Sequence, residues 1–96
     1  MESIAVDRLI EVCREHGTRR VSLFGSFARG DARPESDVDV LVEFEHPTGF
    51  LALVRLEREL SEALGRPVDL LTEDAISPHL RDEIMQSRQV VYEAAG

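Results

Sequence analysis

The chain has 96 residues, with 43% hydrophobic and 31% charged side chains, which are the proportions of one soluble globular domain. Its 19 acidic residues outnumber 11 basic ones and give a formal net charge of -8. This balance argues against direct nucleic-acid binding and against an anionic membrane surface as a partner. Every basic residue is Arg, so the sequence lacks the lysine of a Walker-type phosphate site or of Schiff-base chemistry.

The single cysteine, Cys13, excludes an internal disulfide, and no Cys or His spacing suggests a zinc site. No apolar run reaches the roughly 20 residues that a membrane span needs, and the N-terminus has no signal-peptide pattern. We therefore expect a cytoplasmic, reduced protein without membrane contact, in which residues 1–96 form one domain and Cys13 is a small core side chain.

In the first half of the chain, apolar residues at helical spacing predict a helix over roughly the first sixteen residues, with Ser3 as N-cap and Gly17 at its end. Three shorter segments follow: a strand at 21–24, a turn with one helical turn at 25–30, and a polar loop at 31–36. Residues 37–44 then predict a strand at the centre of a sheet, because the segment becomes mostly apolar after its first residues.

In the second half, residues 46–49 predict a turn that interrupts the regular secondary structure. An amphipathic helix follows and ends at Gly65. Its expected apolar stripe consists of Phe50, Leu53, Val54, Leu56, Leu60 and Leu64. The remaining predicted elements are a strand at 68–72, a helix from Ser77-Pro78 to about Arg88, and a short strand at 89–93. This order of elements predicts an α/β or α+β domain.

Two carboxylates, Asp37 and Asp39, lie two residues apart on a predicted strand, so they leave the same face of it. Leu41, two residues further on, predicts that this face is core. Two adjacent ionised carboxylates repel each other, and burying them without compensation is costly. A divalent cation resolves this conflict, and oxygen ligands of this kind suit Mg²⁺.

A third carboxylate, Asp69, interrupts the apolar strand at 68–72. If this strand lies beside the one that carries Asp37 and Asp39, the three carboxylates converge. They could then hold two metal ions about 3.5–4 Å apart, as in phosphoryl-type transfer. Upstream, Gly25-Ser26 stands where a strand becomes a helical turn, so backbone N–H groups and the Ser26 hydroxyl could bind phosphate oxygens, with Arg29 adding a charged contact.

Each of these features also has a simpler explanation when it is taken alone. Gly-Ser is a common turn, an Asp-x-Asp sequence before a strand often caps a loop, and Asp69 could end a strand beside solvent. Their combination favours a functional site.

The spacing of Gly25-Ser26, ten intervening residues and Asp37-Val38-Asp39 resembles the signature of the polymerase-beta-type nucleotidyltransferase superfamily. The stretch VSLFGSFARGDARPESDVDVLVEF is similar to its smallest members, the minimal nucleotidyltransferase (MNT) domains, and PVDLLT supplies the third acid. The resemblance implies an α+β nucleotidyltransferase fold: a small mixed sheet of about four strands with helices packed against it. It also implies phosphate contacts from Gly25 and Ser26, two Mg²⁺ ions held by Asp37, Asp39 and Asp69, and Asp69 as general base.

The implied reaction transfers a nucleotide to a hydroxyl with release of pyrophosphate. The shortest relatives are typically encoded beside an all-helical HEPN ribonuclease toxin and act as antitoxins, in type VII systems, by transferring AMP from ATP to a tyrosine of the toxin. The resemblance therefore implies a Mg-dependent protein adenylyltransferase with a HEPN partner. Two alternatives stay open: an aminoglycoside-type enzyme with a small-molecule acceptor, and an inhibitory binding module without catalysis.

Overall fold

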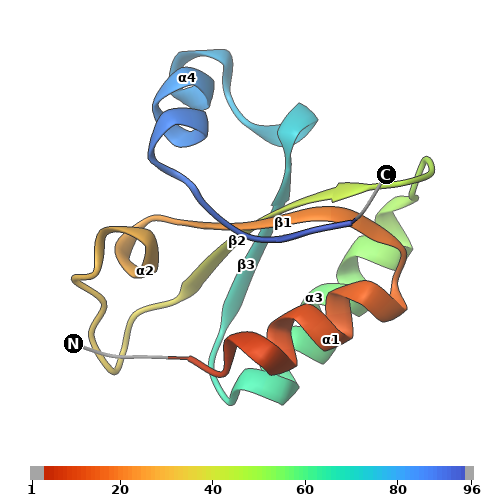
Figure 1. Ribbon diagram of the computed structural model, residues 1–96, viewed down its shortest axis with the longest axis horizontal. Coiled ribbons are helices and arrows are strands. Elements are labelled where there is room, and N and C mark those ends of the chain that lie inside the picture. Colours follow the sequence, from red (N-terminus) through yellow and green to blue (C-terminus); the bar gives the residue numbers. More distant parts are fainter. Residues whose placement is uncertain (1–3, 95–96) are drawn as a thin grey trace.

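The computed structural model describes residues 4–94, which form one layer of β-sheet with helices on both faces (Figure 1). The elements follow in the order α1 (Val6–Glu15), β1 (Thr18–Phe24), α2 (Ser26–Arg29), β2 (Val38–Phe44), α3 (Phe50–Leu64), β3 (Val68–Thr72), the 3-10 helix η1 (Glu73–Ala75), α4 (Pro78–Ser87) and β4 (Gln89–Glu93). This is the predicted alternation of helices and strands.

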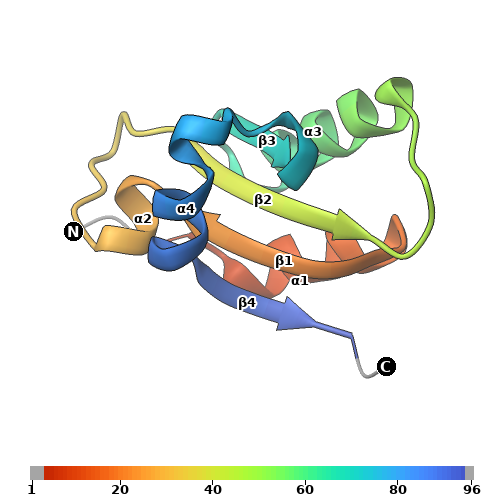
Figure 2. The same ribbon diagram turned by 90° about the horizontal axis from the view of Figure 1, so that it is seen from above.

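The four strands form one mixed sheet in the order β3-β2-β1-β4. Strand β1 pairs antiparallel with β2 and with β4, whereas β2 and β3 are parallel. Figure 2 shows α3 running back beside this parallel pair, which is the crossover that parallel strands require. The predicted α+β fold with a small mixed sheet is confirmed.

The main core lies between the sheet and helices α1 and α3, which pack side by side below the sheet in Figure 1. Both helices present apolar stripes to it, and alternate residues of the strands complete it. Its buried members are Leu9, Val12, Cys13, Val21, Leu23, Val38, Val40, Val42, Leu56, Leu60 and Val68. The prediction that Cys13 is a core side chain is confirmed, and burial raises the pKa of its thiol to about 12.

The opposite face of the sheet carries the residues between these core positions, among them Asp39, Leu41 and Asp69. Helix α4 and η1 lie on this side (Figure 1). The expectation that Leu41 marks the core face is therefore wrong in one respect: Leu41 is buried, but the main cluster uses the other face of β2. Because β2 is central and buried on both faces, alternation could not reveal which face meets the helices.

Two further details differ from the sequence predictions, and one prediction is not tested. Strand β1 begins at Thr18, whose hydroxyl donates to the Cys13 carbonyl oxygen (3.0 Å), rather than at Val21. In the helical stripe, Phe50 and Val54 are exposed, whereas Leu53 between them packs against the core. The predicted N-cap Ser3 lies outside the described residues.

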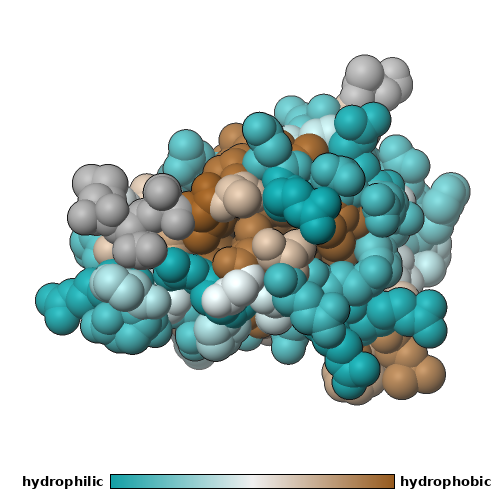
Figure 3. Space-filling model, turned by 90° about the horizontal axis from the view of Figure 1, so that it is seen from below, coloured by the Kyte–Doolittle hydropathy of each residue, from teal (hydrophilic) through white to brown (hydrophobic). Residues whose placement is uncertain are grey.

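The surface below the sheet is shown in Figure 3, where an apolar protrusion marks the end of the molecule at which α3 begins. The exposed apolar side chains of α3 are Phe50, Leu51 and Val54. Within residues 4–94, none of the helices has the length and apolar character that crossing a membrane demands.

Candidate active site

Asp39 lies at the centre of the candidate site because of its position in the sheet. On one side its register partner is Phe24, the last residue of β1, and on the other side it is Asp69 of the parallel strand β3. Neighbouring strands are about 4.8 Å apart, and paired residues point to the same face. The condition set by the sequence, that the Asp69 strand lies beside the Asp39 strand, is met, and the pairing places both carboxylates on the face away from the main core.

Gly25 brings the turn between β1 and α2 against the Asp39 carboxylate. Its backbone has a φ of 69°, which favours glycine. A Cβ at this position would overlap Asp39 Oδ2 and lie 3.1 Å from Asp39 Cγ. Both the backbone conformation and the space therefore require glycine. The close approach places the start of α2, whose first N–H groups have no partner inside the helix, beside the carboxylate.

The electrostatics show which charges surround Asp39. Its half-buried side chain has a raised pKa, first because burial disfavours the charged form and then because Asp69 and Asp37 repel it. Arg29 acts in the opposite direction. The other three predicted charged residues, Asp37, Asp69 and Arg29, thus all affect the pKa of Asp39. A raised carboxyl pKa that combines burial with like charges is typical of functional sites and of cation sites without their cation.

The remaining predicted residues differ in exposure. Asp37 is exposed and directly precedes β2, and Asp69 is exposed on the edge strand β3. Ser26 is half-buried as the first residue of α2. Arg29 is exposed, and its Nε donates to Asp31 Oδ2 at 3.2 Å. The structure therefore brings Gly25, Asp39 and Asp69 into direct proximity, with Asp37 and Arg29 within electrostatic range.

The donor set can be tested against Mg²⁺. Within residues 4–94, no group of three or more His, Cys, Asp or Glu side chains is arranged to hold a metal ion by itself. Magnesium, however, is usually bound by one or two carboxylates together with substrate phosphates and water. The paired carboxylates of Asp39 and Asp69, beside a turn suited to phosphate, fit that ligand set.

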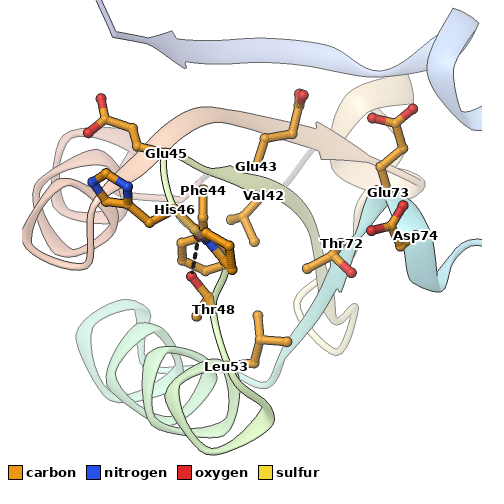
Figure 4. Close-up of a pocket in the computed structure, with 11 residues that line it drawn as sticks. Val42, Glu43, Phe44, Glu45, His46, Thr48, Leu53, Thr72, Glu73 and Asp74 are labelled. Atoms are coloured by element: carbon orange, nitrogen blue, oxygen red, sulfur yellow. Dashed lines mark hydrogen bonds between the residues drawn. The ribbon is translucent and has the colours of Figure 1, made fainter.

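A cavity of about 410 Å³ lies elsewhere, at the opposite ends of β2 and β3 (Figure 4). Its polar lining includes Glu43, Glu45, His46, Glu73 and Asp74. In Figure 4 these side chains come from the end of β2, the following turn and η1. None of the predicted site residues lines this cavity. The candidate active site is therefore a different part of the surface.

Arg66, which precedes β3, is a residue of the site that the sequence did not predict. Its Nη1 donates to the Ser36 carbonyl oxygen at 3.4 Å, and its Cζ lies 5.3 Å from the centre of the Phe27 ring. These two partners are the direct neighbours of Asp37 and Ser26 in the sequence. The only available signal was an arginine three residues before Asp69, which is too weak to interpret without the fold.

Comparison with known proteins shows the family of this chain. The family model described as "Nucleotidyltransferase domain" matches residues 6–91. Protein adenylyltransferase MntA of Thermococcus cleftensis is 36% identical over 92 residues, which cover 96% of this chain and 91% of that protein.

Two solved toxin–antitoxin structures share the fold. One, a toxin–antitoxin with AMP-PNP, has a TM-score of 0.82 at 23% identity and covers 93% of this chain and 73% of that one. The other, a tri-AMPylated Shewanella oneidensis HEPN toxin in complex with its MNT antitoxin, has a TM-score of 0.73 at 21% identity, with 93% and 70% covered.

The chain therefore belongs to the nucleotidyltransferase domain family, a class of enzymes that transfer nucleotides. Within that class it is similar over almost its whole length to the protein adenylyltransferase MntA of Thermococcus cleftensis.

Proposed function

We propose that this protein is an antitoxin that transfers AMP from ATP to a tyrosine hydroxyl of a partner HEPN ribonuclease toxin. The observation that carries the proposal is the packing of the Gly25 turn against Asp39, with Asp69 beside it in register. The similarity to a protein adenylyltransferase over 96% of the chain supports a protein acceptor. A small reduced domain with one unpaired cysteine fits the cytoplasm.

We assign the residue roles from the family resemblance, together with the environment of each side chain. Gly25 and Ser26 bind the triphosphate through backbone N–H groups and the Ser26 hydroxyl. Asp37, Asp39 and Asp69 would hold two Mg²⁺ ions together with phosphate oxygens. Bound there, the cations supply electrostatic stabilisation of the charge that develops on the transferring phosphate.

In the reaction itself, the acceptor oxygen attacks the α-phosphorus of ATP in line with the bond to the leaving oxygen. The new bond joins the acceptor oxygen to AMP, the bond from the α-phosphorus to the bridging oxygen breaks, and pyrophosphate leaves with the electron pair. Asp69 takes the hydroxyl proton, since it is the exposed carboxylate of the register pair and a large acceptor can reach it. Arg29 contributes positive charge to the phosphates.

The test combines the purified protein, Mg²⁺, ATP labelled at the α-phosphate, and the product of the adjacent gene. We expect label on a tyrosine of that product and loss of its ribonuclease activity. Asp39→Asn abolishes the labelling, whereas Asp82→Asn on the exposed face of α4 serves as the matched control and retains it.

Two outcomes would contradict the proposal. Protection by the Asp39→Asn variant, with the complex intact, would indicate an inhibitory binding module. Labelling of an aminoglycoside-type small molecule, with the partner protein unmodified, would indicate a small-molecule acceptor.

A further inference from the structure

Arg66 lies where three segments of the candidate site meet. It follows Gly65, whose positive φ of 69° ends α3, and it leads into β3. Its side chain is half-buried, although an arginine in a short connection is ordinarily exposed. The chain at this point is fixed by a hydrogen bond from the Val38 N–H to the Pro67 carbonyl oxygen (3.0 Å) and by one from the Val68 N–H to Ser61 Oγ (3.1 Å).

From this fixed position the guanidinium contacts two short segments, of which α2 also packs Phe27 and Ala28 against the core. Helix α2 has only four residues and none of them is fully buried. The Arg66 guanidinium lies over the ring of Phe27 in this helix, with Cζ 5.3 Å from the ring centre. The loop before β2 is mostly exposed, and Arg66 Nη1 donates to its Ser36 carbonyl oxygen at 3.4 Å.

These contacts are adjacent to the site in the sequence. Phe27 follows Ser26, Ser36 precedes Asp37, and Asp69 comes three residues after Arg66. The Arg66 side chain therefore links three segments: the proposed phosphate-binding turn, the loop that leads to Asp37, and the connection that leads to Asp69.

We propose that Arg66 is a positioning residue, which fixes the distance between the phosphate-binding turn of α2 and the carboxylates on β2 and β3. The inference rests on the proposed nucleotidyl transfer for its kinetic consequence. Its structural consequence, the ordering of residues 25–37, is independent of that function. Since a misplacement of about 1 Å can cost about a hundredfold in rate, a contact that sets this distance affects turnover without touching substrate.

The guanidinium is suited to this role in a way that an ammonium is not. Its planar group can stack on an aromatic ring and donate hydrogen bonds from its edge at the same time. Lysine retains the charge but lacks the flat face and the several fixed donors. We therefore expect Arg66→Lys to restore only part of what Arg66→Met removes.

The kinetic test measures kcat and the KM for ATP with the Mg²⁺-loaded protein and its acceptor. Arg66→Met should lower kcat about ten- to a hundredfold and change KM less than about threefold, because positioning acts on the transition state rather than on ground-state binding. Arg58→Met, an exposed arginine of α3, is the matched control and should stay within about twofold of the wild type. Phe27→Leu removes the ring, so the double variant Arg66→Met/Phe27→Leu should lose less activity than the product of the single losses.

A second readout does not depend on activity. Hydrogen exchange, followed by mass spectrometry on the whole chain, should show faster exchange over residues 25–37 in Arg66→Met, with α1 unchanged.

The two readouts distinguish the positioning role from the proposed function. Faster exchange in a protein that transfers no AMP overturns the proposed function and leaves the positioning role in place. Unchanged exchange overturns the positioning role. A loss confined to KM would instead identify Arg66 as a direct phosphate ligand, and fully additive losses with Phe27→Leu would show that the ring contact has no part.

Discussion

The two ends of strands β2 and β3 carry acidic residues in opposite situations. At the end where β2 finishes, Glu43 is only 16% exposed and accepts hydrogen bonds from Arg20 Nη1 (2.9 Å) and Arg88 Nη1 (3.4 Å), with Arg19 within 4.0 Å. At the end where β2 begins, Asp39 is half-buried beside two other carboxylates, and its pKa is raised. The Glu43 carboxylate is compensated by three arginines of its own chain, whereas the Asp39 carboxylate has only Arg29 against two like charges.

This difference helps to distinguish a carboxylate that supports the fold from one that is a candidate for binding or catalysis. A carboxylate surrounded by guanidinium groups contributes to folding, and it can remain buried without any ligand. A carboxylate held between other carboxylates opposes folding, and such a group is a candidate for a binding or catalytic role. The cavity of about 410 Å³ lies at the compensated end, so the charge balance, rather than the volume, identifies the candidate site.

The largest expected effect follows from replacing the uncompensated carboxylate. Asp39→Asn should lower AMP transfer about a thousandfold or more, since it removes the central group of the electrostatic site. It should also leave the free energy of unfolding unchanged or raise it, because it removes a desolvated charge from among like charges. Transfer rates and urea unfolding curves of the metal-free protein test both statements. Substantial residual transfer, or a clear loss of stability, would contradict the contrast between the two ends.

The second prediction concerns the close contact at Gly25. Gly25→Ala should cost about 1–3 kcal/mol, because its φ of 69° and ψ of -145° form a conformation that is largely confined to glycine. Because the added Cβ overlaps Asp39 Oδ2, the variant should also lower transfer about a hundredfold. Gly17→Ala is the matched control: Gly17 has a φ of 73°, and no atom lies within 4 Å of the position that its Cβ would take, so this variant should lose stability but keep activity. Equal activity in the two variants would show that the Asp39 contact is not needed.

The third prediction concerns pH. Because the pKa of Asp39 is raised in the folded state above its ordinary value of 3.8, protonation favours folding. The contribution of this group to stability is present below the ordinary value and is lost as the pH rises through the folded-state pKa. Urea unfolding of the metal-free protein from about pH 4 to about pH 7 should therefore show the wild type losing stability relative to Asp39→Asn as the pH increases. A constant difference between the two proteins would contradict this assignment.

Much of the candidate site could be predicted from sequence because its residues are close together in the chain or in strong patterns. Gly25, Ser26, Asp37 and Asp39 lie within fifteen positions, and Asp69 interrupts an apolar strand. Patterns of this kind do not depend on long-range packing. The order of helices and strands was predictable for the same reason.

The features that sequence did not predict depend on contacts between distant segments. The start of β1 was not predicted because Arg19 and Arg20 resemble loop residues until Glu43 and Glu93 are known to lie opposite them. The position of Arg66 became meaningful only when the fold placed it against Phe27. In both cases an arginine owes its role to a partner far away in the sequence.

The smallest expected effect tests the compensated end. Glu43→Gln removes the shared partner of Arg19, Arg20 and Arg88, so three guanidinium groups lose their common counter-charge. We expect a loss of about 1 kcal/mol in unfolding free energy, as for a good but partly exposed ion-pair network, with transfer within about twofold of the wild type. Glu45→Gln, an exposed neighbour on the same strand end, is the control and should change stability by less than about 0.5 kcal/mol. Thermal unfolding in low and high salt measures the difference, which salt should reduce. Glu43→Gln should thus lose stability and keep activity, whereas Asp39→Asn should lose activity and keep stability. If both variants lost the same property, the two ends of the sheet would not differ in function.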